Sequence, residues 1–394
     1  FVRSCTRILL PLAFVGAIVL LLNGAPMTFE GKGTVTTMEG HQQQISRGPV
    51  AAFVAIKQLG TNGGGFYGAN SANPLENPNY LTNMLETIYI MLIPMALIFA
   101  LGYVLKRKKL ALVIFGVMTI GFLSLLLPTV YSEMNGSSAL QHTGILQNMG
   151  SMEGKEVRFG SGASAYWAIS TTCTSNGSVN AMHDSLTPLS GMFALLGMMA
   201  NCFFGGVGVG FINFYVFIIL AVFIGGLMVG RTPEFLGKKI EAKEMKIAMM
   251  VALLHPFLIL VGTALSSYLY ANNPHAYAAW LNNPGYHGFS EMLYEFTSSS
   301  ANNGSGFEGL GDNTPFWNLA TGIVMLLARY IPIVGPVAIA GILANKKYIP
   351  EGNGTLKTDT TTFGLLLMAV IVIVAALSFF PALTLGPIAE YFSM

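Results

Sequence analysis

The feature that most constrains the fold is a series of long apolar runs. Along the chain they cover residues 7–29, 81–105, 110–131, 188–229, 245–270, 315–343 and 362–386. A helix needs about 20 apolar residues to cross ~30 Å of hydrocarbon, so each run is long enough to cross once. Only 10% of the residues are charged, whereas soluble domains carry roughly 25%. We therefore predict an all-α integral membrane protein with seven crossings.

The first run could be mistaken for a signal peptide, because Arg3 and Arg7 precede it. Its length and the lack of a small-residue cleavage site favour a membrane span instead.

The distribution of cations supports the count of seven spans. With seven crossings, fourteen Lys and Arg residues fall in loops on one side and five on the other. The larger group contains Arg3, Arg7, Lys106, Arg107, Lys108, Lys109, Arg231, Lys238, Lys239, Lys243, Lys246, Lys346, Lys347 and Lys357. Cytoplasmic loops carry an excess of Lys and Arg, so this side is predicted to face the cytoplasm.

Three loops on the opposite side contain short, moderately apolar segments. They cover residues 48–59, 162–174 and 288–301. At 1.5 Å per residue, a helix of ~12 residues reaches only ~18 Å, about half of the hydrocarbon thickness. We interpret all three as re-entrant helices.

A similar Asn-Gly loop follows each short segment. The three loops consist of Thr61, Asn62, Gly63 and Gly64; of Ser175, Asn176, Gly177 and Ser178; and of Asn302, Asn303, Gly304 and Ser305. Each loop comes after a half-length helix and before a full span. This order indicates an internal repeat of about 120 residues, and repeats take priority over single motifs.

The repeat predicts membrane helix, pore helix, filter loop and membrane helix units around a pseudo-fourfold pore. We divide the chain into the last helix of a first repeat (1–30), a second repeat (31–105), a third (110–240), a fourth (243–345) and a C-terminal membrane helix (346–394). Because Phe1 stands just before a span, we expect most of the first repeat to lie outside this chain.

The composition of the loops favours a cation. Non-helical backbone at membrane depth is tolerated only where it is buried in protein or lines a cavity. Glycine permits positive φ and close approach, so carbonyl oxygens can replace the hydration shell of a cation. The half-helices direct the negative ends of their dipoles the same way. A phosphate would need helix N-termini and a Gly-Lys-Ser or Gly-Lys-Thr ending, which the loops lack. One such loop alone would be an ordinary turn.

The run 188–229 is too long for one straight crossing. Gly205, Gly206, Gly208 and Gly210 lie in its middle. Glycine costs about 1 kcal/mol in a helix interior relative to alanine, so four together predict a broken helix. The alternative is a close helix–helix contact of small residues. A dinucleotide fingerprint is excluded because no βαβ context surrounds it.

Residues 60–78, 170–191, 222–240 and 298–310 resemble the potassium-binding, channel-like A subunits of the bacterial Kdp potassium-transporting P-type ATPases. The resemblance covers essentially the whole chain. It implies that the three loops are K⁺-binding selectivity segments, with Gly63, Gly177 and Gly304 at the positions used for potassium selectivity. It also implies that the segment around Gly205, Gly206, Gly208 and Gly210 is a gate loop.

The resemblance further implies a location in the bacterial cytoplasmic (inner) membrane. A separate P-type subunit would hydrolyse ATP, and small accessory membrane subunits would complete the complex. K⁺ would be the transported ion, without an organic cofactor. The chain has no aspartyl-phosphate DKTG motif, so we expect it to be non-catalytic.

Two other functions remain open. One is a self-sufficient potassium channel or cation symporter of the same superfamily. The other is a membrane enzyme or assembly protein, although the sequence offers no paired carboxylates, HExxH motif or nucleophile elbow.

Several single residues have more than one interpretation. Arg329 is a charged residue within a span, and such residues usually face a cavity or a charged partner. The resemblance implies that Arg329 has a coupling role. The alternative is that its side chain snorkels towards the cytoplasmic surface. His255 stands before Pro256, which favours a kink over a proton relay. His183 has no metal ligand at a suitable spacing, so we expect a structural role. The cysteines are interpreted as small buried residues.

Acidic residues follow every filter loop: Glu76, Asp184, Glu308 and Asp312. At a pore mouth they would raise the local cation concentration. Exposed loops commonly contain acids, so ordinary solvated carboxylates are the alternative.

Overall fold

The structure is a computed structural model, and it describes residues 2–68, 70–350, 352 and 355–394. Within these described residues, seven helical segments are long and apolar enough to cross a membrane: Val2–Leu22, Tyr80–Val104, Lys108–His142, Val209–Val229, Ala242–Asn272, Pro315–Ala344 and Thr361–Ser393. The predictions of an all-α membrane protein and of seven spans are confirmed.

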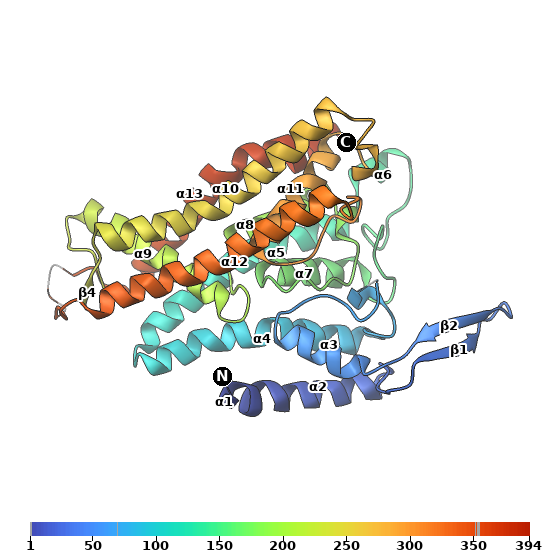
Figure 1. The fold of residues 1–394 in the computed structure, drawn as a ribbon, viewed down its shortest axis with the longest axis horizontal. Coiled ribbons are helices and arrows are strands. Elements are labelled where there is room, and N and C mark those ends of the chain that lie inside the picture. The colour runs from blue at the N-terminus through green and yellow to red at the C-terminus, as the bar shows by residue number, and fades with distance from the viewer. Residues whose placement is uncertain (1, 69, 351, 353–354) are drawn as a thin grey trace.

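The spans contain the following helices, of which all but α14 are labelled in Figure 1. These are α1 (Val2–Ser4), α2 (Leu10–Leu22), α4 (Tyr80–Val104), α5 (Lys108–Asn135), α6 (Ser138–His142), α9 (Val209–Val229), α10 (Ala242–Asn272), α12 (Pro315–Ala344), α13 (Thr361–Leu383) and α14 (Ala389–Ser393). The shorter helices are α3 (Val50–Leu59), α7 (Gly160–Cys173), α8 (Pro188–Ala200) and α11 (Tyr286–Ala301). There are also two small antiparallel strand pairs, β1 (Lys32–Thr36) with β2 (Gln42–Ser46) and β3 (Glu234–Phe235) with β4 (Lys238–Lys239).

The helices lie in three groups (Figure 1). One contains α2, α3 and α4, another contains α10, α12 and α13, and α5, α7 and α8 lie between them. The half-length helices α3, α7 and α11 correspond to the predicted re-entrant segments. Helix α7 packs against both α5 and α8, and the side chain of Trp167 at its centre is fully buried. Helix α7 is therefore enclosed by the protein, whereas Phe53 and Ile56 on α3 are exposed.

Polar side chains cap the beginnings of three of the long helices. The side chains of Asn79, Thr314 and Thr360 accept hydrogen bonds from backbone N–H groups in the first turns of α4, α12 and α13. Such caps satisfy donors that have no partner inside the helix.

The first span ends earlier than the sequence predicts. The predicted run extends to residue 29, but α2 ends at Leu22. Asn23 follows, and its side-chain amide donates to Val19 O at 2.8 Å. Gly24 then adopts φ +107°, which a helix cannot contain. The capping residues therefore end the helix at Leu22, although the sequence remains apolar for several more residues.

The predicted break in the run 188–229 is confirmed. Helix α8 ends at Ala200, and α9 begins at Val209. Gly205 and Gly208 have positive φ values of +61° and +84°. Gly210 was predicted to lie in the break but belongs to the first turn of α9. A Cβ on Gly210 would come 2.2 Å from Gly205 Cα, so this glycine is needed for a close backbone contact.

The loops rich in cations gather at one end of the molecule. Figure 1 places the N-terminus, the α4–α5 turn and β4 at this end. The β1–β2 hairpin, α6 and the C-terminus lie at the other end. The structure thus groups the loops as the seven-span topology requires. The hairpin itself was not expected from the sequence.

Candidate functional site

The three Asn-Gly loops share one backbone conformation. The residue before each central asparagine is left-handed: φ is 48° at Thr61, 51° at Ser175 and 54° at Asn302. The glycine after each asparagine also has positive φ, with values of 66° at Gly63, 86° at Gly177 and 102° at Gly304. Only glycine adopts this region without strain. The repeat seen in the sequence is therefore also present in the dihedral angles.

The loops are numbered by their repeat: the second contains Asn62, the third Asn176 and the fourth Asn303. They are linked to one another in succession. In each repeat the N–H of the central asparagine donates to a carbonyl near the end of its own half-helix, at Lys57, Thr171 or Ser298. The asparagine side chain of the next repeat donates to the same carbonyl. Asn176 Nδ2 lies 3.5 Å from Lys57 O, and Asn303 Nδ2 lies 2.8 Å from Thr171 O. Three loops that are far apart in the sequence thus form one connected structure.

The glycines allow neighbouring loops to approach. A Cβ on Gly63 would lie 1.9 Å from Asn176 O, and one on Gly177 would lie 2.0 Å from Asn303 O. By contrast, a Cβ on Gly304 would have no described heavy atom within 4 Å. The close contacts between loops therefore join Gly63 to Asn176 and Gly177 to Asn303, whereas the side of the fourth loop at Gly304 is open.

Most N–H groups of the third and fourth loops have partners. Thr171 Oγ1 accepts from Gly177 N at 2.9 Å, and Ser298 Oγ accepts from Gly304 N at 3.0 Å. The side-chain oxygens of Asn176 and Asn303 accept from the N–H groups two residues later, at 2.9 Å and 2.8 Å. A bound ion would therefore meet carbonyl and hydroxyl oxygens rather than amide hydrogens.

Buried aromatic side chains support two of the loops from behind. Trp167 Nε1 donates to Ser178 O at 2.8 Å, and the Tyr294 hydroxyl lies 2.9 Å from Ser305 Oγ. Both aromatics stand nine residues before the central asparagine of their repeat. Aligning the repeats on the asparagines would have found this shared position, which the sequence reasoning missed.

A buried ion pair anchors the second loop. Lys57 Nζ lies 2.5 Å from Glu76 Oε2, and the Glu76 side chain is fully buried. The expectation that Glu76 is a free acid at the mouth is therefore wrong, because Lys57 neutralises it. Asp184 is also buried, at 7% exposure, whereas Glu308 and Asp312 are exposed.

His183 has a structural environment. Its side chain is fully buried, and Nδ1 lies 2.9 Å from the Tyr294 hydroxyl. Burial, aided by the nearby Lys155, lowers the pKa of His183 to about 4, so the ring is neutral at physiological pH. This agrees with the role expected from the sequence.

A cavity of about 210 Å³ lies against the loops. Its lining includes Thr61, Asn62, Ser175 and Asn302 from the loops, Asn201, Gly206 and Val207 from the break, and His255 and Arg329 from α10 and α12. The break is bonded to the loops: Val207 N donates to Thr61 Oγ1 at 3.0 Å, and Ser175 Oγ donates to Asn201 Oδ1 at 3.0 Å. The predicted gate segment therefore lies directly beside the second and third loops.

Two charged or titratable side chains face this cavity. Arg329 Nε donates to Asn302 Oδ1 at 3.0 Å, so Arg329 contacts the fourth-repeat loop rather than only a helix surface. His255 lies 2.7 Å from Ser300 Oγ and 3.1 Å from Met198 O. Both ring nitrogens thus have partners, as expected for a satisfied imidazole.

The fold and the linked loops define a polytopic helical membrane protein built from repeated re-entrant units. Residues 1–392 match the family model of the potassium-transporting ATPase A subunit, KdpA. The chain is 65% identical to the potassium-transporting ATPase potassium-binding subunit of Flavobacterium psychrophilum, over all of this chain and 70% of that relative. It is 63% identical to the subunit of the same name from Parabacteroides distasonis, with the same coverage. The chain belongs to the family of potassium-transporting ATPase A subunits.

Proposed function

We propose that this chain is the potassium-binding and translocating subunit of an ATP-driven uptake complex in the bacterial inner membrane. K⁺ enters from the side of the β1–β2 hairpin and loses its hydration shell at the three loops. The observation that carries the proposal is that most N–H groups of the third and fourth loops donate to pore-helix hydroxyls, pore-helix carbonyls and asparagine oxygens. Oxygen atoms remain for the ion.

The binding residues are those of the three loops: Thr61, Asn62, Gly63 and Gly64; Ser175, Asn176, Gly177 and Ser178; and Asn302, Asn303, Gly304 and Ser305. Their carbonyl oxygens replace water around a dehydrated cation. The C-terminal ends of α3, α7 and α11 add a negative potential at the same place. An anion would be repelled by both.

The loop of the first repeat completes the ring at the open side of Gly304. The links from Gly63 to Asn176 and from Gly177 to Asn303 show the packing that such a loop would repeat. The free space at the Gly304 Cβ position accommodates an approaching carbonyl in the same way.

The ion leaves the loops through the cavity beside the broken helix. The segment that contains Gly205, Gly206 and Gly208 blocks a straight path and directs the ion towards a separate ATP-hydrolysing subunit. Arg329 places a positive charge in this cavity and repels a second cation. Small accessory membrane subunits complete the complex, and K⁺ is its transported ion.

Replacing Asn303 by alanine tests the proposal. The variant loses the bond to Thr171 O and the bond from Ser305 N. Each hydrogen bond contributes about 1 kcal/mol, so the K⁺ concentration needed for half-maximal ATPase stimulation is expected to rise by about tenfold or more. The measurement is ATP hydrolysis by the assembled complex against K⁺ concentration, with Na⁺ in parallel.

Asn313→Ala is the matched control, because Asn313 is exposed in the following loop. An unchanged K⁺ response in the Asn303 variant would argue against ion binding at the loops. K⁺-selective transport by the isolated chain without ATP would favour a self-sufficient channel or symporter.

A further inference from the structure

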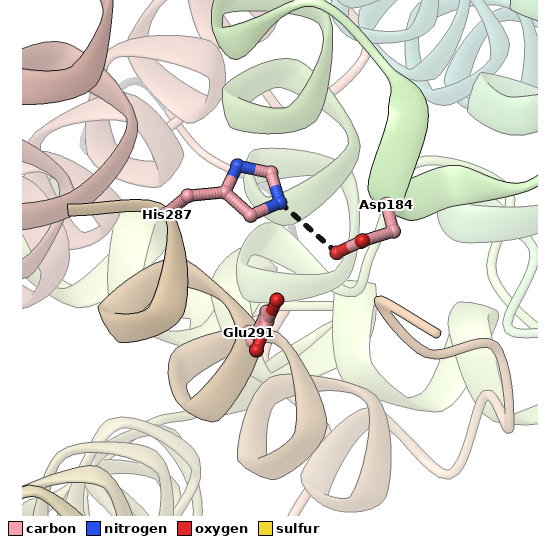
Figure 2. Close-up of side chains that lie close together, drawn as sticks. All are labelled: Asp184, His287 and Glu291. Atoms are coloured by element: carbon pink, nitrogen blue, oxygen red, sulfur yellow. Dashed lines mark hydrogen bonds and ion pairs between the residues drawn. The ribbon is translucent and has the colours of Figure 1, made fainter. Parts of the chain in front are cut away.

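A second polar cluster lies away from the filter loops, at the outer end of α11. Asp184 follows the third loop, whereas His287 and Glu291 stand one turn apart on α11. One nitrogen of His287 and one oxygen of each carboxylate lie within 4.8 Å of one another. Figure 2 shows the three side chains converging from two segments, with the Glu291 carboxylate near the gap between His287 and Asp184.

Glu291 is the unusual member of this cluster. Its side chain is fully buried, and its Oε1 accepts from Asn283 Nδ2 at 3.1 Å. Its Oε2 has no hydrogen-bond partner among the described residues. A buried carboxylate oxygen without a partner is costly, because it has lost water and gained nothing in exchange. A cation at this position would remove that cost.

The orientation of His287 suits a metal ligand. Nδ1 lies 2.7 Å from Glu390 Oε1 on α14, and Nε2 lies 3.0 Å from Asp184 Oδ1. The ring also stacks on Phe307 at 5.7 Å. A ring between two carboxylates either carries both protons or holds a cation in place of one. A carboxylate on the remote ring nitrogen is the usual outer partner of a metal-bound histidine.

The surrounding residues orient the ligands. Asn283 Nδ2 also donates to Asp184 Oδ2 at 3.2 Å, which leaves Oδ1 facing the cluster. A Cβ on Gly309 would lie 2.3 Å from Glu291 Oε1 and 2.6 Å from Asp184 Oδ2, so only glycine fits beside the two carboxylates. The His287 side chain is 18% exposed, which provides access from outside.

We propose that Asp184, His287 and Glu291 form a binding site for a divalent transition-metal ion. One imidazole nitrogen and two carboxylate oxygens match the preferences of Zn²⁺ and Co²⁺, whose ligand atoms lie roughly 2 Å from the metal. The ion joins the loop after the third filter segment to α11 and, through His287 and Glu390, to α14. This site is independent of the proposed K⁺ loops.

Co²⁺ is the probe for the site, because bound Co²⁺ absorbs visible light. The full-length protein, purified in detergent with its complex, is titrated with Co²⁺ in saturating K⁺. We expect one bound Co²⁺ per chain and a Zn²⁺-dependent rise in the thermal unfolding midpoint. Glu291→Gln should weaken Co²⁺ binding at least about tenfold, and Glu390→Gln about 10-fold to 100-fold, as for an outer partner.

Glu291→Gln preserves the size of the side chain and the oxygen that bonds Asn283, so it is expected to fold. Gly309→Ala is a second variant, which retains every ligand but fills the space beside the carboxylates. His275→Gln and Glu39→Gln change exposed residues of the same types and are the controls.

Failure of the wild-type protein to bind Co²⁺ at stoichiometric concentration would overturn the proposal. Equal Co²⁺ affinity in the wild type and Glu291→Gln would also overturn it. A second titration without K⁺ checks the location: additional Co²⁺ binding that saturating K⁺ abolishes, with none left in saturating K⁺, would place the metal at the loops and overturn the proposal.

Discussion

The complex carrying Gly177→Asp is expected to lose most of its discrimination between K⁺ and Na⁺. Gly177 has φ +86°, and any Cβ there would lie 2.0 Å from Asn303 O. The side chain therefore displaces the adjoining loop and places a carboxylate beside the carbonyl oxygens. We expect the ratio of half-maximal Na⁺ and K⁺ concentrations for ATPase stimulation to fall by about tenfold or more, which corresponds to at least about 1.4 kcal/mol.

Two glycines serve as comparisons. Gly304→Asp meets no described atom within 4 Å, although its φ of +102° is also unfavourable for other residues. Because the proposed first-repeat loop would bring a carbonyl to this position, we expect Gly304→Asp to lower the ion discrimination of the complex as well. Gly31 is exposed and has open space around its Cβ position, so Gly31→Asp should behave as the wild type. Unchanged ion discrimination in Gly177→Asp would contradict the assignment of the loops.

The second large effect is expected from Lys57→Met. The variant leaves Glu76 fully buried without the ammonium group that lies 2.5 Å away. Breaking a buried ion pair by removing one partner typically costs about 3–5 kcal/mol. The midpoint of thermal unfolding, followed by circular dichroism in detergent, should therefore fall clearly below that of the wild type.

The double variant Lys57→Met/Glu76→Gln tests the cause of this loss. It removes both charges, so it should recover much of the stability. Arg47→Met breaks the pair between Arg47 and Glu30, in which the side chains are 42% and 73% exposed. An exposed pair contributes at most about 1 kcal/mol. Equal effects of Lys57→Met and Arg47→Met would contradict the importance of burial.

Local sequence patterns predicted the spans and the half-helices well. The segment 48–59 corresponds to α3 at Val50–Leu59, and 288–301 corresponds to α11 at Tyr286–Ala301. Apolar length decides whether a helix can cross a bilayer, and this property is contained in contiguous residues. The break before Val209 was also predictable, because several glycines together oppose a continuous helix.

Contacts between distant segments were not predictable from local patterns. Lys57 meets Glu76 and Asp184 meets His287 only after the helices have packed. Nothing in the spacing of these residues distinguishes them from solvated loop charges. The same limit applied to the partners of the loop asparagines, since a hydrogen bond from Asn303 to Thr171 O joins two different repeats.

The successive asparagine-to-carbonyl bonds make the three loops thermodynamically interdependent. Each carbonyl that accepts such a bond belongs to the half-helix of the preceding repeat. The position of one loop therefore depends on the position of the loop before it. Substitutions in different loops should therefore be non-additive, and under the proposed function the affinity for K⁺ should depend on all three loops together.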